Sequence, residues 1–280
     1  MTATDPEVVL GRLRDLPVLP QALTDLLTAL QRDDVAMDEL VDAISHDQAL
    51  VAKALRLANS SFYGLSGRVS SIRGAISVLG LRNLSTALTA AAVSGSFAAP
   101  RCRGFDLAAY WRHSIACALC ARHLARALKL DDGAAFTAGL LHDLGRLALA
   151  SQSPERLEQV YDYRQQHDCQ TLQAEGEVLG TDHMAIGAVV ARRWRFGGDV
   201  VEAIRHHHAP VPAAAPTLTD LVHVSDGLVH ALDLARVPDD MVPPLAADAW
   251  NRLALTQPQC DTVLERTEAE LDELCEALSV

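Results

Sequence analysis

Residues 138–146 read Ala-Gly-Leu-Leu-His-Asp-Leu-Gly-Arg, and they set a polar pair, His142 and Asp143, between apolar side chains. The apolar residues on both sides predict a buried helix, which we expect to run from about Gly133 to Ala150. Burying a carboxylate beside an imidazole costs on the order of several kcal/mol when nothing compensates the charge. A partner is therefore expected at this pair, either a bound metal ion or a purely structural ion-pair network.

The chain on both sides of this stretch supplies further side chains that can bind metal. Some of them are again polar residues embedded in apolar helical runs, and the full set of potential ligands is His113, His142, Asp143, His183, His207, His208 and Asp226. Imidazole and carboxylate groups together suit Fe, Mn or Zn, and a cluster of this size can hold two ions bridged by a carboxylate and a water molecule. The sequence thus predicts a divalent transition-metal site for one or two ions.

Several of these residues also have a simpler interpretation. His183 follows an aspartate that is a good N-cap, so its polarity can mark nothing more than the start of a helix. In the run His206–His208, adjacent helical residues diverge by about 100°, so at least one imidazole must face solvent, and we expect it to be His206. Arg146 can contact a phosphate group or only pair with Asp143.

Other side chains close to the predicted ligands have weaker claims to a role. His223 and His230 lie three and four residues from Asp226, where they can hydrogen-bond it or form a plain polar stripe. Cys117 and Cys120 lie three residues apart with no second cysteine pair, so we expect packing and not zinc binding.

Composition and periodicity predict an all-α fold. Leu and Ala dominate, hydrophobic residues make up 49% and aromatic residues only 4%, which favours helix packed on helix over sheets. The helical pattern lapses near residues 98–104, where we place a boundary. We therefore expect an N-terminal helical bundle over 1–100, packed on a helical domain with the metal site over 101–235, and a C-terminal helical extension over 236–280.

In the first half we expect a helix after Pro20 and helices over about 37–44, 48–59 and 72–79, the last of them ended by Gly80. In the second half Asp106 is the expected N-cap of a helix that runs to about 128. The helices that follow span about 133–150, 154–167, 171–179, 182–195, 199–208, 218–234 and 258–278.

Charge and cysteine usage exclude several classes of protein. The formal net charge is −12 and no Lys/Arg-rich block occurs, so direct nucleic-acid binding is not expected. Six scattered cysteines and an N-terminus without the features of a signal peptide indicate a cytoplasmic protein. No run of about 18 apolar residues occurs, so we expect no membrane span.

The order of the ligands resembles that of a known superfamily. A His, a His-Asp pair and a later Asp on separate predicted helices, here His113, His142-Asp143 and Asp226, resemble the ligands of HD phosphohydrolases. His183 and the pair His207-His208 resemble the extra ligands of the binuclear HD-GYP phosphodiesterases.

The first half resembles one branch of that superfamily. Residues 16–20 (Leu-Pro-Val-Leu-Pro), 47–50 (Asp-Gln-Ala-Leu), 57–61 (Leu-Ala-Asn-Ser-Ser) and 75–80 (Ala-Ile-Ser-Val-Leu-Gly) are similar to the N-terminal signature of HDOD domains, the HD-related output domains of bacterial signalling. Trp111, the 139–145 segment and Trp194 continue the likeness, which covers about residues 10–235.

The two resemblances imply different functions. HDOD domains are thought to have lost hydrolase activity, whereas the ligand set resembles that of active relatives. Departures from the HD-GYP pattern argue against activity: Ala209-Pro210-Val211-Pro212 replaces the acidic residue and Gly-Tyr-Pro loop, Arg146 replaces a Lys, and Ala109 stands where some relatives have a third-metal Glu.

Our leading hypothesis from the sequence is a regulatory HDOD module with a metal site, acting on a signalling protein partner or sensing a nucleotide or phosphate ligand. The alternative is an active metal-dependent phosphohydrolase or phosphodiesterase on a nucleotide-type substrate, with Arg146 contacting the phosphate.

Overall fold

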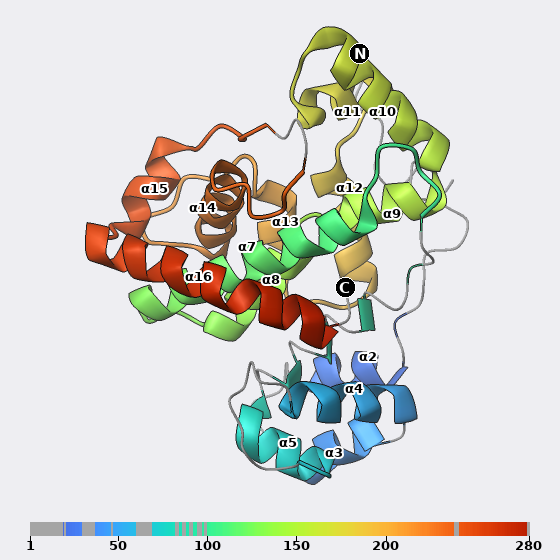
Figure 1. Cartoon of the computed structure of the whole chain (residues 1–280), viewed down its shortest axis with the longest axis vertical. Coiled ribbons are helices and arrows are strands. Elements are labelled where there is room, and N and C mark those ends of the chain that lie inside the picture. The colour runs from blue at the N-terminus through green and yellow to red at the C-terminus, as the bar shows by residue number, and fades with distance from the viewer. Residues whose placement is uncertain are drawn as a thin grey trace.

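The computed structural model describes residues 19, 21–29, 37–45, 47–59, 69–81, 84–85, 88–89, 92–93, 97, 100–237 and 241–278. Every regular element within these ranges is a helix, which confirms the all-α prediction. Figure 1 shows two lobes: helices α2 to α5 form a small one, and helices from α7 onward form a larger one. No helix of the described ranges is long and apolar enough to cross a membrane.

The small lobe holds four described helices: α2 (Gln21–Ala29), α3 (Met37–Ser45), α4 (Gln48–Ala58) and α5 (Ile72–Leu79). Their bounds match the amphipathic stretches of the sequence, and Asp47 starts α4 by accepting a hydrogen bond from the Leu50 backbone N–H at 3.1 Å. Gly80 ends α5 with a φ of 75°, a conformation that favours glycine. Of the signature segments, residues 16–18, Pro20 and Ser60-Ser61 lie outside the described residues.

Helix α7 (Leu107–Leu128) runs through the centre of the large lobe, as Figure 1 shows. The Asp106 side chain caps it by accepting from the N–H groups of Ala108 and Ala109, as the sequence predicted. Helix α8 (Asp132–Leu141) packs against α7 closely enough that a Cβ on Gly139 would lie 2.8 Å from the Cys117 carbonyl oxygen. A glycine is required at this crossing.

The helix expected over 133–150 is two helices. Helix α8 ends at Leu141 and α9 (Leu144–Gln152) begins after a turn that holds His142 and Asp143. The prediction of one continuous helix was therefore wrong. The break has a physical reason, because neighbouring residues of a continuous helix point about 100° apart and the turn lets both side chains face the same cluster.

Helix α9 crosses α12 (His183–Arg193) at another glycine contact. A Cβ on Gly145 would lie 1.9 Å from the His183 carbonyl oxygen, and one on Gly187 would lie 3.0 Å from the Gly145 nitrogen. The contact joins Gly145, two residues after Asp143, to His183, the first residue of α12. This crossing sets the distance between the Asp143 carboxylate and the His183 imidazole.

The remaining helices of the large lobe are α10 (Pro154–His167), α11 (Thr171–Leu179), α13 (Gly198–His206), α14 (Leu218–Ala231), α15 (Ala247–Leu253) and α16 (Gln257–Leu278). The sequence did not predict α15, a helix of 7 residues. Helix α16 lies along α7 and buries Val263, Thr267, Leu271, Leu274 and Cys275. Its Glu270 pairs with Arg122 at 3.0 Å and with His123 at 3.2 Å on α7.

Candidate metal centre

Six helices and their ends bring the predicted ligands to one place. His113 comes from α7, the pair His142-Asp143 from the turn between α8 and α9, and Asp226 from α14. His183 opens α12, and His207 and His208 follow the end of α13. His208 is partly buried, and the other six side chains are buried. All seven residues therefore belong to one buried constellation.

The first cluster consists of His113, Cys117, His142 and Asp226, whose candidate ligand atoms all lie within 4.8 Å of one another. His113 Nε2 lies 3.2 Å from His142 Nε2 and 3.2 Å from Asp226 Oδ1. His142 Nε2 lies 3.6 Å from the same carboxylate oxygen. The two imidazoles and the carboxylate thus surround a common point.

The second cluster consists of His183, His207 and His208, which also satisfy the 4.8 Å limit. His183 Nε2 and His207 Nε2 are 3.3 Å apart. Asp143 lies between the two clusters, with Oδ1 at 3.3 Å from His183 Nε2 and at 3.8 Å from His207 Nε2, and Oδ2 at 3.7 Å from His142 Nε2. Its position is that of a carboxylate able to bridge two ions.

Hydrogen bonds at the outer nitrogens of three imidazoles fix which nitrogen carries the proton. Nδ1–H of His142 donates to the Gly139 carbonyl at 2.7 Å, and Nδ1–H of His207 donates to the Ile204 carbonyl at 2.9 Å. Nδ1–H of His183 donates to the Glu175 carboxylate at 2.6 Å. Each neutral ring then presents an Nε2 lone pair to the cluster, which is the arrangement of metal-binding histidines.

The lone pairs of His183 and His207 face each other at 3.3 Å, and two acceptors cannot hydrogen-bond without a cation between them. Asp143 Oδ1 and Asp226 Oδ2 are buried without a hydrogen-bond partner in the described part of the chain. Buried polar groups are normally satisfied. Converging lone pairs and unsatisfied carboxylate oxygens are therefore what a divalent metal ion would fit.

The charge states of these groups also suit metal. Burial would raise the pKa of Asp143, but Arg146 and the neighbouring histidines hold it well below its usual value. Burial likewise opposes ionisation of Asp226, and the neighbouring His113, His142 and His230 lower its pKa well below the usual value. Burial and the neighbouring His183 lower the pKa of His208 to about 3. His142 is an exception, because burial would lower its pKa but Asp143 and Asp226 outweigh burial and raise the pKa. Ionised carboxylates and neutral imidazoles are the forms that bind metal.

The three remaining histidines of this region, His206, His223 and His230, have different partners. His206 lies outside both clusters, near Glu202 at 3.4 Å. His230 reaches Asp226 Oδ1 at 3.3 Å, whereas His223 donates to the His207 carbonyl at 2.6 Å and does not serve Asp226. The predicted hydrogen bond to Asp226 is therefore available to His230 and not to His223.

Cys117 and Cys120, which we expected to serve only in packing, lie in different surroundings. Cys120 is a core residue, but Cys117 places its Sγ 3.5 Å from His113 Nε2 within the first cluster. Sequence reasoning dismissed Cys117 because no second cysteine pair follows it. Its spacing of one helical turn from His113 was the available signal.

Glu175 on α11 is a site residue that sequence reasoning missed. It is fully buried, and its Oε2 accepts from the backbone N–H of His183 at 2.9 Å as well as from its ring. A carboxylate behind a histidine fixes the ring orientation and makes the ligand more basic. The signal in the sequence was weak, because Glu175 sits in an otherwise ordinary helix.

Replacing Glu175 by glutamine is expected to weaken metal binding by about 10- to 100-fold, because the amide orients His183 less firmly and carries no charge. The matched control is Glu177→Gln, an exposed glutamate on the same helix. Titration of metal-free protein with Zn²⁺ or Mn²⁺ measures the effect. Equal affinities for the two variants would contradict the role assigned to Glu175.

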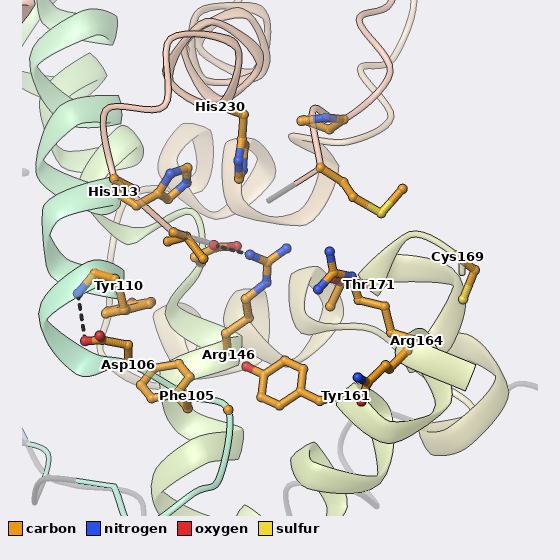
Figure 2. Close-up of a pocket in the computed structure, with 18 of the residues that line it drawn as sticks. Phe105, Asp106, Tyr110, His113, Arg146, Tyr161, Arg164, Cys169, Thr171 and His230 are labelled. Carbon is orange, nitrogen blue, oxygen red and sulfur yellow. Dashed lines mark hydrogen bonds and ion pairs between the residues drawn. The ribbon is translucent and has the colours of Figure 1, made fainter. Parts of the chain in front are cut away.

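A cavity of about 670 Å³ opens onto the clusters, and His113, Asp143, Arg146, His208 and His230 are among the residues that line it. Figure 2 shows Arg146 extending into this cavity, with His113 and His230 on one side and Tyr161 on the other. Arg146 Nη1 donates to Asp143 Oδ2 at 2.9 Å, while its Nε has no partner among the described residues. Arg146 thus pairs with Asp143 and also faces the cavity.

Comparisons with known proteins connect this arrangement to a family. The family model of the HDOD domain matches residues 16–210. A protein of Shewanella amazonensis, whose crystal structure is described as that of a candidate phosphohydrolase, superimposes with a TM-score of 0.75 at 28% identity and covers 96% of this chain and 97% of its own.

Two curated relatives match over part of their length. An uncharacterised protein of Treponema pallidum is 28% identical over 241 residues, and Ribonuclease Y of Thermus thermophilus is 32% identical over 151 residues. These matches cover 84% and 54% of this chain, but only 46% and 21% of the relatives. The chain thus spans less than half the length of either curated relative.

Proposed function

The chain belongs to the HDOD domain family, and from this premise we propose that it is a cytoplasmic, bacterial signal-transduction module that binds two divalent transition-metal ions. The ions are Fe, Mn or Zn. The ligands we propose are His113, His142, Asp143, His183, His207, His208 and Asp226. The module acts on a signalling protein partner or through a nucleotide or phosphate ligand in the cavity.

The observation that carries the metal site is the pair of Nε2 atoms of His183 and His207, which lie 3.3 Å apart with both Nδ1 atoms already donating. A structural ion-pair network, the simpler alternative, joins these two nitrogens only if one ring binds a second proton. A divalent cation between them needs no such proton.

Three observations favour a regulatory role. Ala109 lines the cavity one turn before His113 and offers no metal ligand there. No residue of the 209–217 loop, which stands in place of the Gly-Tyr-Pro loop of HD-GYP enzymes, is among the described residues that line the cavity. Arg146 is paired with Asp143, so part of its guanidinium is already occupied and is not available to a phosphate group.

The histidines that follow α13 provide a matched test of the metal site. His207→Ala is expected to lower metal content because it removes a ligand of the second cluster, whereas His206→Ala should keep the wild-type content. Elemental analysis of both proteins, purified without chelators, measures this. Identical metal content in the two variants would contradict the assignment of His207.

The second candidate is a metal-dependent phosphohydrolase, and the cavity that reaches Asp143 and Arg146 favours it. Bound divalent ions would supply Lewis acidity at this site. Arg146 would bind a phosphate oxygen through the guanidinium edge that carries its unpartnered Nε. Asp143 would orient that guanidinium through its Oδ2.

A panel of nucleotides and phosphodiesters separates the two functions. The regulatory proposal predicts no metal-dependent product release from protein with both sites loaded. Release that requires metal, and that Asp143→Ala abolishes in a folded protein, would establish the hydrolase instead.

A further inference from the structure

Cys117 lies on the face of α7 that carries a proposed metal ligand. It follows His113 by four residues, so the two side chains project from the same side of the helix. Cys117 is fully buried, and its Sγ lies 3.5 Å from His113 Nε2 and within 4.8 Å of the His142 and Asp226 ligand atoms. No other cysteine in the described ranges joins a candidate ligand group.

The distances within the first cluster fit a tetrahedral site that includes the sulfur. Metal–nitrogen bonds of about 2.1 Å and metal–sulfur bonds of about 2.3 Å place tetrahedral N and N atoms about 3.4 Å apart and N and S atoms about 3.6 Å apart. The cluster shows 3.2 Å between the two Nε2 atoms and 3.5 Å between Sγ and Nε2. Asp226 Oδ1 lies 3.2 Å and 3.6 Å from the two imidazoles.

The charges also balance. A thiolate at Cys117 and the carboxylate of Asp226 carry two negative charges, which match one divalent cation, while the imidazoles of His113 and His142 complete the set as neutral ligands. Buried ions are stable only when they are paired in this way. Burial and the neighbouring Asp226 raise the pKa of the Cys117 thiol well above its usual value, so its proton leaves to solvent only when the metal binds.

We propose that Cys117 is a further ligand of the first cluster, beside His113, His142 and Asp226, and that its thiolate makes this site prefer zinc-like ions. The proposal rests on the metal-binding function above and adds one ligand, Cys117, to the first of the two sites. A soft sulfur ligand favours Zn²⁺ over Mn²⁺, whereas the imidazoles of the second cluster with Asp143 supply only nitrogen and oxygen. The two sites therefore differ in metal preference.

Cobalt substitution tests the proposal directly, because Co²⁺ bound to thiolate absorbs in the near ultraviolet through charge transfer from sulfur. Metal-free wild-type protein titrated with Co²⁺ is expected to develop this band, and Cys117→Ser is expected to lose it. Cys120→Ser is the matched control, since Cys120 is a buried cysteine of the same helix that belongs to no candidate ligand group. It should keep the band.

Zinc affinity provides a second readout. Cys117→Ser is expected to bind Zn²⁺ at the first site more weakly by more than about tenfold, the scale on which even indirect partners of a ligand act. Its Mn²⁺ affinity at the second site should be unchanged. X-ray absorption of zinc-loaded wild-type protein needs no variant and should show one sulfur neighbour at about 2.3 Å.

The outcomes distinguish this proposal from the function on which it rests. Metal bound without a charge-transfer band and without a sulfur neighbour would overturn the role of Cys117 and leave the metal-binding module intact. Protein that binds no metal at all would overturn both. A band that persists in Cys117→Ser but disappears in Cys120→Ser would show that Cys120 is the ligand, and it would also refute the proposal.

Discussion

Replacing Asp143 by alanine is expected to remove both metal ions, because its two oxygens reach histidines of both clusters. Each site would lose a ligand and the bridge, so affinity should fall by more than about 100-fold, beyond what losing an indirect partner costs. The metal-free variant should also be less stable by about 2–3 kcal/mol, since Arg146 keeps its charge without its partner. The Arg146 side chain is 21% exposed, which places the loss below that of a fully buried pair.

Elemental analysis and chemical denaturation of the metal-free proteins measure these two effects separately. Asp162→Ala is the matched control, because Asp162 lines the same cavity and pairs with an arginine, Arg103, at 2.8 Å. Asp162 belongs to neither cluster, so the Asp162→Ala protein should keep both ions. An Asp143→Ala protein that folds and retains both metals would contradict the bridging role.

Replacing Gly145 by alanine is expected to destabilise the protein by about 3 kcal/mol or more, at the upper end of overpacking costs. The added Cβ would lie 1.9 Å from the His183 carbonyl oxygen, and backbone atoms cannot move aside as a flexible side chain can. Helices α9 and α12 must separate, which carries Asp143 away from His183. Binding at the second cluster should therefore weaken together with stability.

The control for this substitution is Gly176→Ala on α11, where an added Cβ meets no heavy atom of the described structure within 4 Å. It should raise stability by about 0.5–1 kcal/mol, as expected when alanine replaces glycine within a helix. Thermal unfolding of both metal-free variants compares them. A Gly145→Ala protein as stable as Gly176→Ala would show that the crossing does not determine the site.

Much of the fold was predictable because it depends on local rules. The caps at Asp106 and Gly80 and the apolar periodicity placed α5 and α7 where the structure has them. The break at His142-Asp143 was not predictable, since the flanking residues are good helix formers and apolar on all sides. Only the tertiary crossing of α9 with α12 shows why the chain turns there.

The candidate site was predictable to the same extent. Polar residues within apolar runs pointed to His113, the pair His142-Asp143 and Asp226, because burial of an unpaired charge is costly wherever it occurs. The other three proposed ligands, His183, His207 and His208, were predicted from the resemblance to HD-GYP phosphodiesterases. Glu175 and Cys117 escaped because their roles depend on which helices pack together. Glu175 serves a histidine on the next helix, and Cys117 serves residues from the α8–α9 turn and from α14.

The metal content of the wild-type protein tests the central claim most directly. Protein purified without chelators, or stripped and then incubated with Fe²⁺, Mn²⁺ or Zn²⁺, should contain about two transition-metal ions per chain by elemental analysis, as a carboxylate-bridged pair of sites requires. Protein that remains free of metal after all three incubations would contradict it.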